Sequence, residues 1–92
     1  MKWDDFMNNY TNSNTKFLRE KKKISQEKMA KDLHIDQSTL AKWESNSRKI
    51  TLEWAIKLAY YFDVNIGDFI SKDFTHDIHY ITTNNKNKEK GV

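Results

Sequence analysis

The fold of this chain is decided by residues 25–44, which read SQEKMAKDLHIDQSTLAKWE. Ser25 is suited to cap a first helix, which ends near Leu33. The connection that follows has only three residues and ends in Asp36, which is suited to cap a second helix over residues 37–44. Two short helices are therefore predicted to meet across a tight turn, as in a helix-turn-helix.

Three more helices are predicted around this pair. One runs over residues 14–22 and ends in lysines, which suit the negative end of a helix dipole. Thr51 is suited to cap a helix over residues 52–62, and Asn65 is suited to cap a short one over residues 66–70. The sequence therefore predicts an all-α fold with a domain of five helices.

Segments on both sides extend this domain. Apolar side chains at helical spacing predict an extra amphipathic helix at the N-terminus, formed by Trp3, Phe6, Met7 and Tyr10. Residues 78–83 are rich in β-branched and aromatic side chains and suit a short strand, and the polar residues 82–92 suit a disordered tail. The expected organisation is an N-terminal helix and linker over 1–13, the five-helix domain over 14–71 and a C-terminal extension over 72–92.

The composition limits the class of protein. The 92 residues contain no cysteine and no proline and only two glycines, which excludes disulfides and cysteine-ligated zinc fingers and favours helices over sheets. No apolar run approaches the roughly 20 residues of a membrane span, and Asp4 and Asp5 do not fit a signal peptide. We therefore expect a cytoplasmic protein of one domain, without a membrane partner.

Charge is distributed unevenly along the chain. Residues 16–49 carry ten Lys or Arg against five acids, a net charge of +5, whereas residues 50–80 carry two lysines against five acids, a net charge of −3. A basic field on one part of a domain is suited to a polyanion such as nucleic acid. Solvated lysine-rich helices would give the same pattern, so charge alone leaves both interpretations open.

The second helix of the pair has two chemically different faces. At about 100° per residue, Leu40 and Trp43 lie on a face that suits the core. The opposite face carries small and polar side chains, namely Gln37, Ser38, Ala41 and Lys42. An amide can bond adenine bidentately, a lysine can bond the acceptors of guanine, and Ala can touch a thymine methyl. The strip therefore suits the major groove of DNA, although ordinary solvent-facing residues would look alike.

Three motifs together resemble a known family. Leu18-Arg19-Glu20, Ile24-Ser25-Gln26-Glu27-Lys28-Met29-Ala30 and Ser38-Thr39-Leu40-Ala41-Lys42-Trp43-Glu44 follow one another without gaps in register. This pattern resembles the Cro/C1-type, or XRE-like, helix-turn-helix domain of phage repressors and bacterial regulators. The resemblance covers roughly residues 14–70 and implies a lambda-repressor-like domain that binds double-stranded DNA.

The resemblance also implies roles for individual residues. Ser25 and Gln26 would hold a phosphate at the start of the first helix of the pair. Gln37 and Ser38 would face base edges beside Ala41, and Lys42 would reach a base or a phosphate. Backbone phosphates would be contacted further on by Arg48 and Lys49. In several members of the family the positions of Arg19 and Glu44 form a partly buried ion pair, which we interpret as structural.

Five positions depart from the family pattern. Lys23, His34 and Asn46 stand where glycine is common, and Ile50 replaces a common proline. Glycine positions of this kind often need left-handed backbone, which suits Lys least, so we expect the turn at Lys23 to be built differently. Asp36, at the start of the second helix, places a carboxylate near phosphates and would weaken binding unless it accepts a bond from cytosine.

The helix over 52–62 suggests a second surface. Its core face is predicted to hold Leu52, Ala55, Ile56, Leu58, Ala59 and Phe62. Trp54 and Tyr61 fall outside this arc and would be partly exposed, as at a dimer interface or at the edge of the core. Related domains pair through this region, so a homodimer is expected with an interface formed by Trp54, Tyr61, Phe69 and Ile70.

Other functions receive less support from the sequence. No nucleophile motif, glycine-rich phosphate loop or paired His and carboxylate is visible, so no enzyme, catalytic residue or cofactor is expected. His76 and His79 are too few to argue for a metal. We expect a sequence-specific transcriptional regulator, a repressor that binds a two-fold symmetric operator. A second interpretation stays open, in which the same fold serves as an antitoxin or binds another protein partner such as an anti-repressor.

Overall fold

The computed structural model describes residues 10–76, and this part of the chain is helical without strands. In chain order its helices are α2 (Thr11–Lys21), α3 (Gln26–Leu33), α4 (Gln37–Glu44), α5 (Leu52–Phe62), α6 (Ile66–Ser71) and the short 3-10 helix η1 (Phe74–His76). The predicted all-α fold is confirmed. The predicted helix over 1–10 lies outside the described residues except for Tyr10, and the strand over 78–83, the tail and His79 lie wholly outside them.

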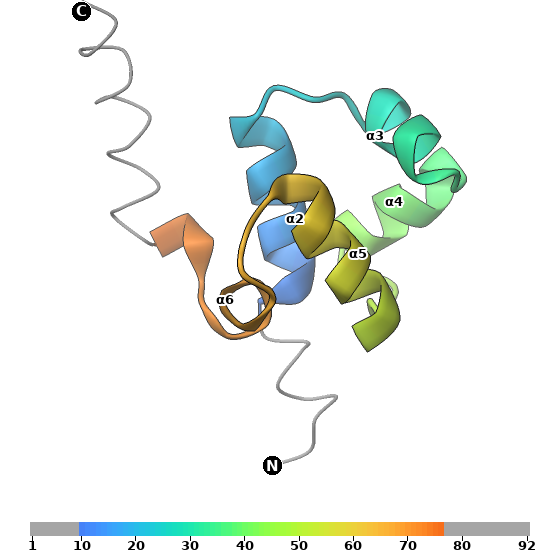
Figure 1. Ribbon diagram of the computed structural model, residues 1–92. Coiled ribbons are helices and arrows are strands. Elements are labelled where there is room, and N and C mark those ends of the chain that lie inside the picture. The colour runs from blue at the N-terminus through green and yellow to red at the C-terminus, as the bar shows by residue number, and fades with distance from the viewer. Residues whose placement is uncertain (1–9, 77–92) are drawn as a thin grey trace, which may run out of the picture.

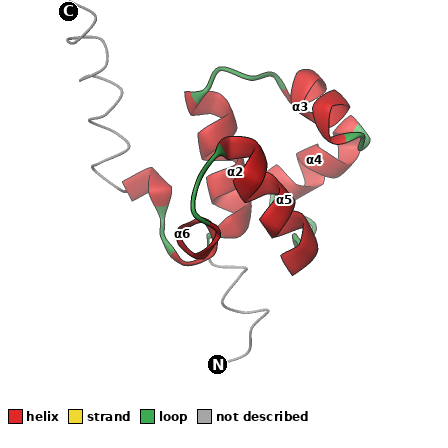
Figure 2. Cartoon of the chain, viewed as in Figure 1, coloured by secondary structure: helices red, strands yellow, loops and turns green. Residues whose placement is uncertain are grey.

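Helix α2 occupies the middle of the molecule. It packs against α4, α5, α6 and η1, and Figure 1 shows it between the α3–α4 pair on one side and α6 with η1 on the other. Short loops join the helices (Figure 2). Among the helices described, none is long and apolar enough to cross a membrane.

The core draws apolar side chains from every helix. Met29 of α3, Leu40 of α4 and Leu58 of α5 are fully buried, and Phe62 and Phe69 pack with their ring centroids 6.2 Å apart. Each such side chain contributes about 1.5–3 kcal/mol on burial. Because α3 and α4 have only eight residues each, they depend on this packing, since isolated helices of that length are unstable in water.

Three of the predicted N-caps form as expected. Ser25 Oγ accepts a hydrogen bond from the backbone N–H of residue 28 at 3.0 Å, and Asn65 Oδ1 accepts one from residue 68 at 3.0 Å. Thr51 Oγ1 accepts one from residue 54 at 3.2 Å. Asp36 occupies the N-cap position of α4 with extended backbone, but its carboxylate makes no capping bond. This carboxylate therefore remains exposed at the positive end of the helix dipole.

The four helices α2 to α5 all end in the same type of turn. The left-handed residues are Lys23 (φ 59°), His34 (φ 59°), Asn46 (φ 64°) and Asp63 (φ 58°). At each one, its own N–H and that of the next residue bond back to the last helical turn, as from Lys23 to Glu20 and from Ile24 to Arg19, both 3.0 Å. This is the Schellman motif. The expectation that the turn at Lys23 would be built differently was wrong, because these two bonds hold the lysine in the conformation that glycine usually adopts.

Helix α2 begins at Thr11, three residues before the predicted start at residue 14. The polar stretch that reads as a linker is its first turn, and Thr11, Asn12 and Asn14 are buried there. Both asparagine amides bond to backbone carbonyls of other segments, and these long-range bonds stabilise a helical turn that the local sequence does not favour.

Helix α5 is rotated relative to its predicted core face. Ala55, Leu58 and Phe62 are buried as expected, but Leu52 is 42% exposed and Ile56 is 51% exposed. Trp54 and Tyr61 turn toward neighbouring helices instead. The Trp54 ring packs on Trp43 of α4 with centroids 5.4 Å apart, and the Tyr61 hydroxyl donates to Asp32 of α3 at 2.8 Å. The predicted burial of Leu52 and Ile56 was therefore wrong, because aromatic contacts of Trp54 and Tyr61 with α4 and α3 determine which face is buried.

The packed core continues past residue 71, the predicted end of the domain. Phe74 in η1 is fully buried, and its backbone N–H donates to Asn14 Oδ1 at 3.0 Å. Both contacts join η1 to the same core as the helices before it. Phe74 is therefore part of the domain.

Replacing Phe74 by alanine is expected to lower the free energy of unfolding by about 3–5 kcal/mol. The neighbouring His76→Ala is the control, because that side chain is 83% exposed and its contact with Asp73 lies at the surface. Such surface changes stay within about 0.5 kcal/mol. Urea unfolding of both variants measures the difference, and equal midpoints would remove Phe74 from the core.

Candidate nucleic-acid interface

Helix α4 presents the predicted polar strip to solvent. Gln37, Ser38 and Lys42 are exposed and Ala41 is half-buried, whereas Leu40 and Trp43 on the other face are buried. The two buried side chains anchor the helix to the core. As a result, the amide, hydroxyl and ammonium groups of the strip are exposed along one side of two helical turns.

A buried ion pair joins α4 to α2. Arg19 Nε donates to Glu44 Oε2 at 2.6 Å and Arg19 Nη2 donates to Glu44 Oε1 at 3.0 Å, with side chains only 12% and 3% exposed. The hydrogen bond to Glu44 raises the pKa of Arg19 against the opposing effect of burial. Arg19 Nη1 also donates to the carbonyl of Ile24 at 2.7 Å. The pair thus fixes the last residue of α4 to α2 and to the loop before α3.

The same carboxylate starts a chain of side-chain amides that ends on the strip. Gln26 Nε2 donates to Glu44 Oε1 at 3.0 Å, and Gln37 Nε2 donates to Gln26 Oε1 at 3.4 Å. Gln37 is exposed, and this long bond orients its amide toward Gln26. Sequence reasoning assigned both glutamines to DNA without seeing this link. Their spacing across the turn was the available signal, since both occupy the first turns of helices that cross.

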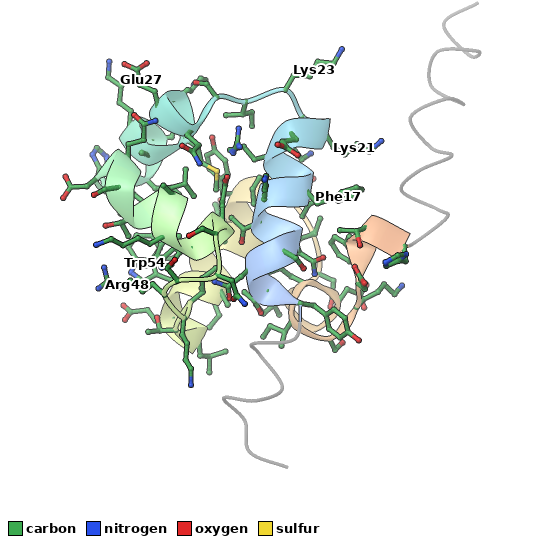
Figure 3. The ribbon with its side chains drawn as sticks, turned by 180° about the vertical axis from the view of Figure 1, so that it is seen from behind. Phe17, Lys21, Lys23, Glu27, Arg48 and Trp54 are labelled. Atoms are coloured by element: carbon green, nitrogen blue, oxygen red, sulfur yellow. The ribbon has the colours of Figure 1, made fainter. Side chains whose placement is uncertain are left out.

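Cations and helix ends suited to phosphates surround the strip. Ser25 is exposed at the N-terminus of α3, where the helix dipole is positive. Arg48 and Lys49 are exposed after α4 and line a small hollow of about 130 Å³ together with Trp43 and Trp54. Figure 3 shows Arg48 beside Trp54, whereas Phe17 and Lys21 project from the opposite side of α2.

Acidic groups interrupt this basic surface. Asp36 and Glu27 are both exposed near the starts of α4 and α3. Lys28 is partly neutralised by Asp32, with Nζ 3.1 Å from Oδ2. A polyanion would therefore meet localised cations rather than a continuous positive field, which places more weight on Arg48, Lys49 and Lys42.

Of the four residues predicted to form a dimer interface, two are buried in the core and two are half-buried. Phe69 is fully buried and Ile70 is 3% exposed, so both belong to the core of the monomer and offer no surface to a partner. This corrects their assignment, because α6 is amphipathic and directs these two side chains inward. Trp54 and Tyr61 are half-buried and line an open groove of about 670 Å³ between α3 and α5.

Tyr61 is held at the edge of that groove. Burial and the hydrogen bond to Asp32 raise the pKa of Tyr61 to about 12, and the bond from Tyr61 together with that from Lys28 lowers the pKa of Asp32. The exposed apolar surface of α5 lies beside them, at Leu52, Ile56 and Tyr60, of which Tyr60 is 88% exposed. Sequence reasoning missed this stripe because it assigned Leu52 and Ile56 to the core.

Metal-ligating side chains do not cluster within residues 10–76. No group of three His, Cys, Asp or Glu residues is arranged there to hold a metal ion. His76 lies 3.6 Å from the carboxylate of Asp73, an exposed contact at the end of η1.

Comparison with known proteins agrees with this geometry. The model of a helix-turn-helix domain family, which is XRE-like, matches residues 13–73, about two thirds of the chain, so the chain belongs to that family. This membership indicates DNA binding linked to transcription regulation, in a family that is typically not enzymatic. No curated protein and no solved structure shows significant similarity to the chain.

The ion pair between Arg19 and Glu44 leads to a stability prediction. Glu44→Gln removes the negative charge while keeping the shape, which leaves a partly buried guanidinium without its counter-charge. Breaking a buried pair in this way is expected to lower the free energy of unfolding by about 3 kcal/mol. The matched control is Glu53→Gln, which breaks an exposed pair with Lys57 (3.7 Å) and is expected to cost less than about 1 kcal/mol. Similar urea midpoints for the two variants would contradict a structural role for the buried pair.

Proposed function

We propose that this protein is a transcriptional repressor that binds a two-fold symmetric operator as a homodimer in the cytoplasm. The observation that carries the proposal is the exposed strip on α4, in which Gln37 is oriented by Gln26 while cations lie beyond the end of the helix. A helix of this kind fits the major groove with its N-terminal residues on base edges.

Base readout is assigned to the exposed strip of α4. Gln37 carries an amide that matches the N6 and N7 atoms of adenine, and Ser38 and Lys42 can bond further base edges. Ala41 is small enough to let the helix approach and to touch a thymine methyl. The tether from Gln26 lowers the number of conformations that Gln37 loses on binding, which favours a single base contact.

Backbone contacts are assigned to the two sides of the strip. Ser25 and Gln26 lie at the positive end of α3, and Arg48 and Lys49 lie past the C-terminus of α4. Phosphate contacts on both sides would fix the register of α4 in the groove.

Gln37→Ala is expected to weaken binding to an operator selected from random DNA by about 1–3 kcal/mol and to relax preference at one base pair per half-site. Binding to random DNA should change little, because no phosphate contact is lost. Fluorescence anisotropy with both DNAs measures the ratio. Equal weakening on operator and random DNA would remove Gln37 from base readout.

Arg48→Ala is expected to act in the opposite way, weakening both DNAs and lowering the salt slope of log K by about one unit. The control is Lys21→Ala, because Lys21 projects from the far side of α2 (Figure 3). Titrations at several salt concentrations give the slope. If Arg48→Ala and Lys21→Ala leave the same slope, Arg48 does not contact DNA.

Dimerisation is assigned to the exposed face of α5. Leu52, Ile56 and Tyr60 are spaced four residues apart, so they form one apolar stripe along the helix. A self-complementary stripe suits a two-fold interface, with Trp54 and Tyr61 beside it. A single α4 helix contacts too few base pairs for discrimination in a genome, so a second copy supplies the second half-site.

Sedimentation of the protein at micromolar concentration is expected to show a dimer, and Ile56→Asp is expected to shift it to a monomer because a carboxylate enters the apolar stripe. Glu53→Ala, on the same helix, is the control. Half-sites about 10 base pairs apart should be recovered in the selected operator. A wild-type monomer that binds DNA one-to-one would contradict this assignment.

A further inference from the structure

Asn12, in the first turn of α2, bonds both to the last turn of α4 and to the segment that follows α4. Its Nδ2 donates to the carbonyl of Trp43 and to the carbonyl of Arg48, both at 2.8 Å. The side chain is only 4% exposed, so water does not compete strongly for these bonds. One amide group therefore joins the last turn of α4 to the backbone of a residue assigned to phosphate.

The segment between these two carbonyls also forms backbone hydrogen bonds with the end of α4. The N–H groups of Ser47 and Arg48 donate to the carbonyl of Lys42 at 2.9 and 3.2 Å, and Asn46 donates to Trp43 at 3.1 Å. These bonds shape the turn but connect it only to α4 itself. The side chain of Asn12 bonds this segment to α2, which lies at the centre of the fold.

We propose that Asn12 is a positioning residue for DNA binding, which sets the distance between the base-reading strip of α4 and the phosphate contact of Arg48. The inference rests on the proposed function, since it assigns a device to that same surface. Contacts on both sides of a recognition helix define its register only if their spacing is fixed, and a shift of about 0.5 Å already degrades a preorganised site.

The hydrogen bonding of Asn12 differs from that expected of a purely stabilising residue. Its Oδ1 is buried and accepts no hydrogen bond from the described part of the chain, which is a cost to stability. Asn14 lies two residues further along α2, and both polar atoms of its amide are bonded. Its Nδ2 donates to the carbonyls of Phe69 and Lys72, and its Oδ1 accepts from the backbone N–H of Phe74. Asn14 fastens α6 and η1, away from α4.

Asn14 is therefore the matched control for Asn12. Both are buried asparagines of α2 whose amides each donate to two backbone carbonyls, but only Asn12 touches the segment that carries Arg48. Loss of either bond pair lowers stability. Loss of the Asn12 pair alone is expected to change DNA binding by the molecules that remain folded.

The test is a double-mutant cycle on the full chain with Asn12→Ala and Arg48→Ala, and a second cycle with Asn14→Ala in place of Asn12→Ala. Affinity for the selected operator is measured by anisotropy and corrected for the folded fraction from urea unfolding. In the wild type, Arg48→Ala is expected to weaken binding about tenfold, as for a charged hydrogen bond. In the Asn12→Ala background the same change should weaken it less than about threefold, whereas in the Asn14→Ala background the full tenfold loss should remain.

Other outcomes distinguish failure of the Arg48 contact from failure of the role of Asn12. If Arg48→Ala has no effect in the wild type, the phosphate contact fails and the proposed function loses that part of its interface. If Arg48→Ala costs the same in the Asn12→Ala and wild-type backgrounds, DNA binding stands and the role of Asn12 is overturned. Should Asn12→Ala not fold, the cycle is measured in trimethylamine N-oxide, which favours the folded state. It is also repeated with Asn12→Ser, which keeps one hydrogen-bond donor.

Discussion

The carboxylate of Glu44 is the group on which the arrangement of the proposed DNA-binding surface depends. It is the last residue of α4, and it accepts hydrogen bonds from Arg19 of α2 and from Gln26 of α3. A helix of eight residues has little stability of its own, so its orientation is set by such contacts. Because the carboxylate is 3% exposed, its charge must be matched by Arg19, and the pair joins the end of α4 to α2.

Much of the fold follows from local signals. The N-caps at Ser25, Thr51 and Asn65 lie in sequence next to the groups that they bond, so the residue type alone predicts them. The turn at His34 follows from the short connection between the two predicted helices. The strip on α4 is predictable for the same reason, since eight residues at helical spacing define both its faces. The ion pair came from the family resemblance rather than from spacing, because its partners are far apart in the chain.

The features that sequence reasoning missed are long-range. Asn12 and Asn14 lie in a stretch that reads as a polar linker, and only the carbonyl groups of distant segments make it a buried helical turn. The rotation of α5 depends on Trp43 and Asp32, which attract Trp54 and Tyr61 from other helices. A hydrophobic arc about 160° wide on a helix does not by itself show which of its two edges packs against neighbouring helices and which stays exposed.

Helix α2 holds α4 and the segment after it in place through two largely buried polar side chains, those of Arg19 and Asn12. Its last turns hold the end of α4 through Arg19, and its first turn holds the segment after α4 through Asn12, so both bonds act on the same short part of the chain. The exposed residues of α4 and Arg48 would then move as one body with the core. If α4 and Arg48 meet DNA as proposed, the specificity of binding depends on buried polar groups of α2, and changes there alter binding through the spacing of the contacts rather than through the contacts themselves.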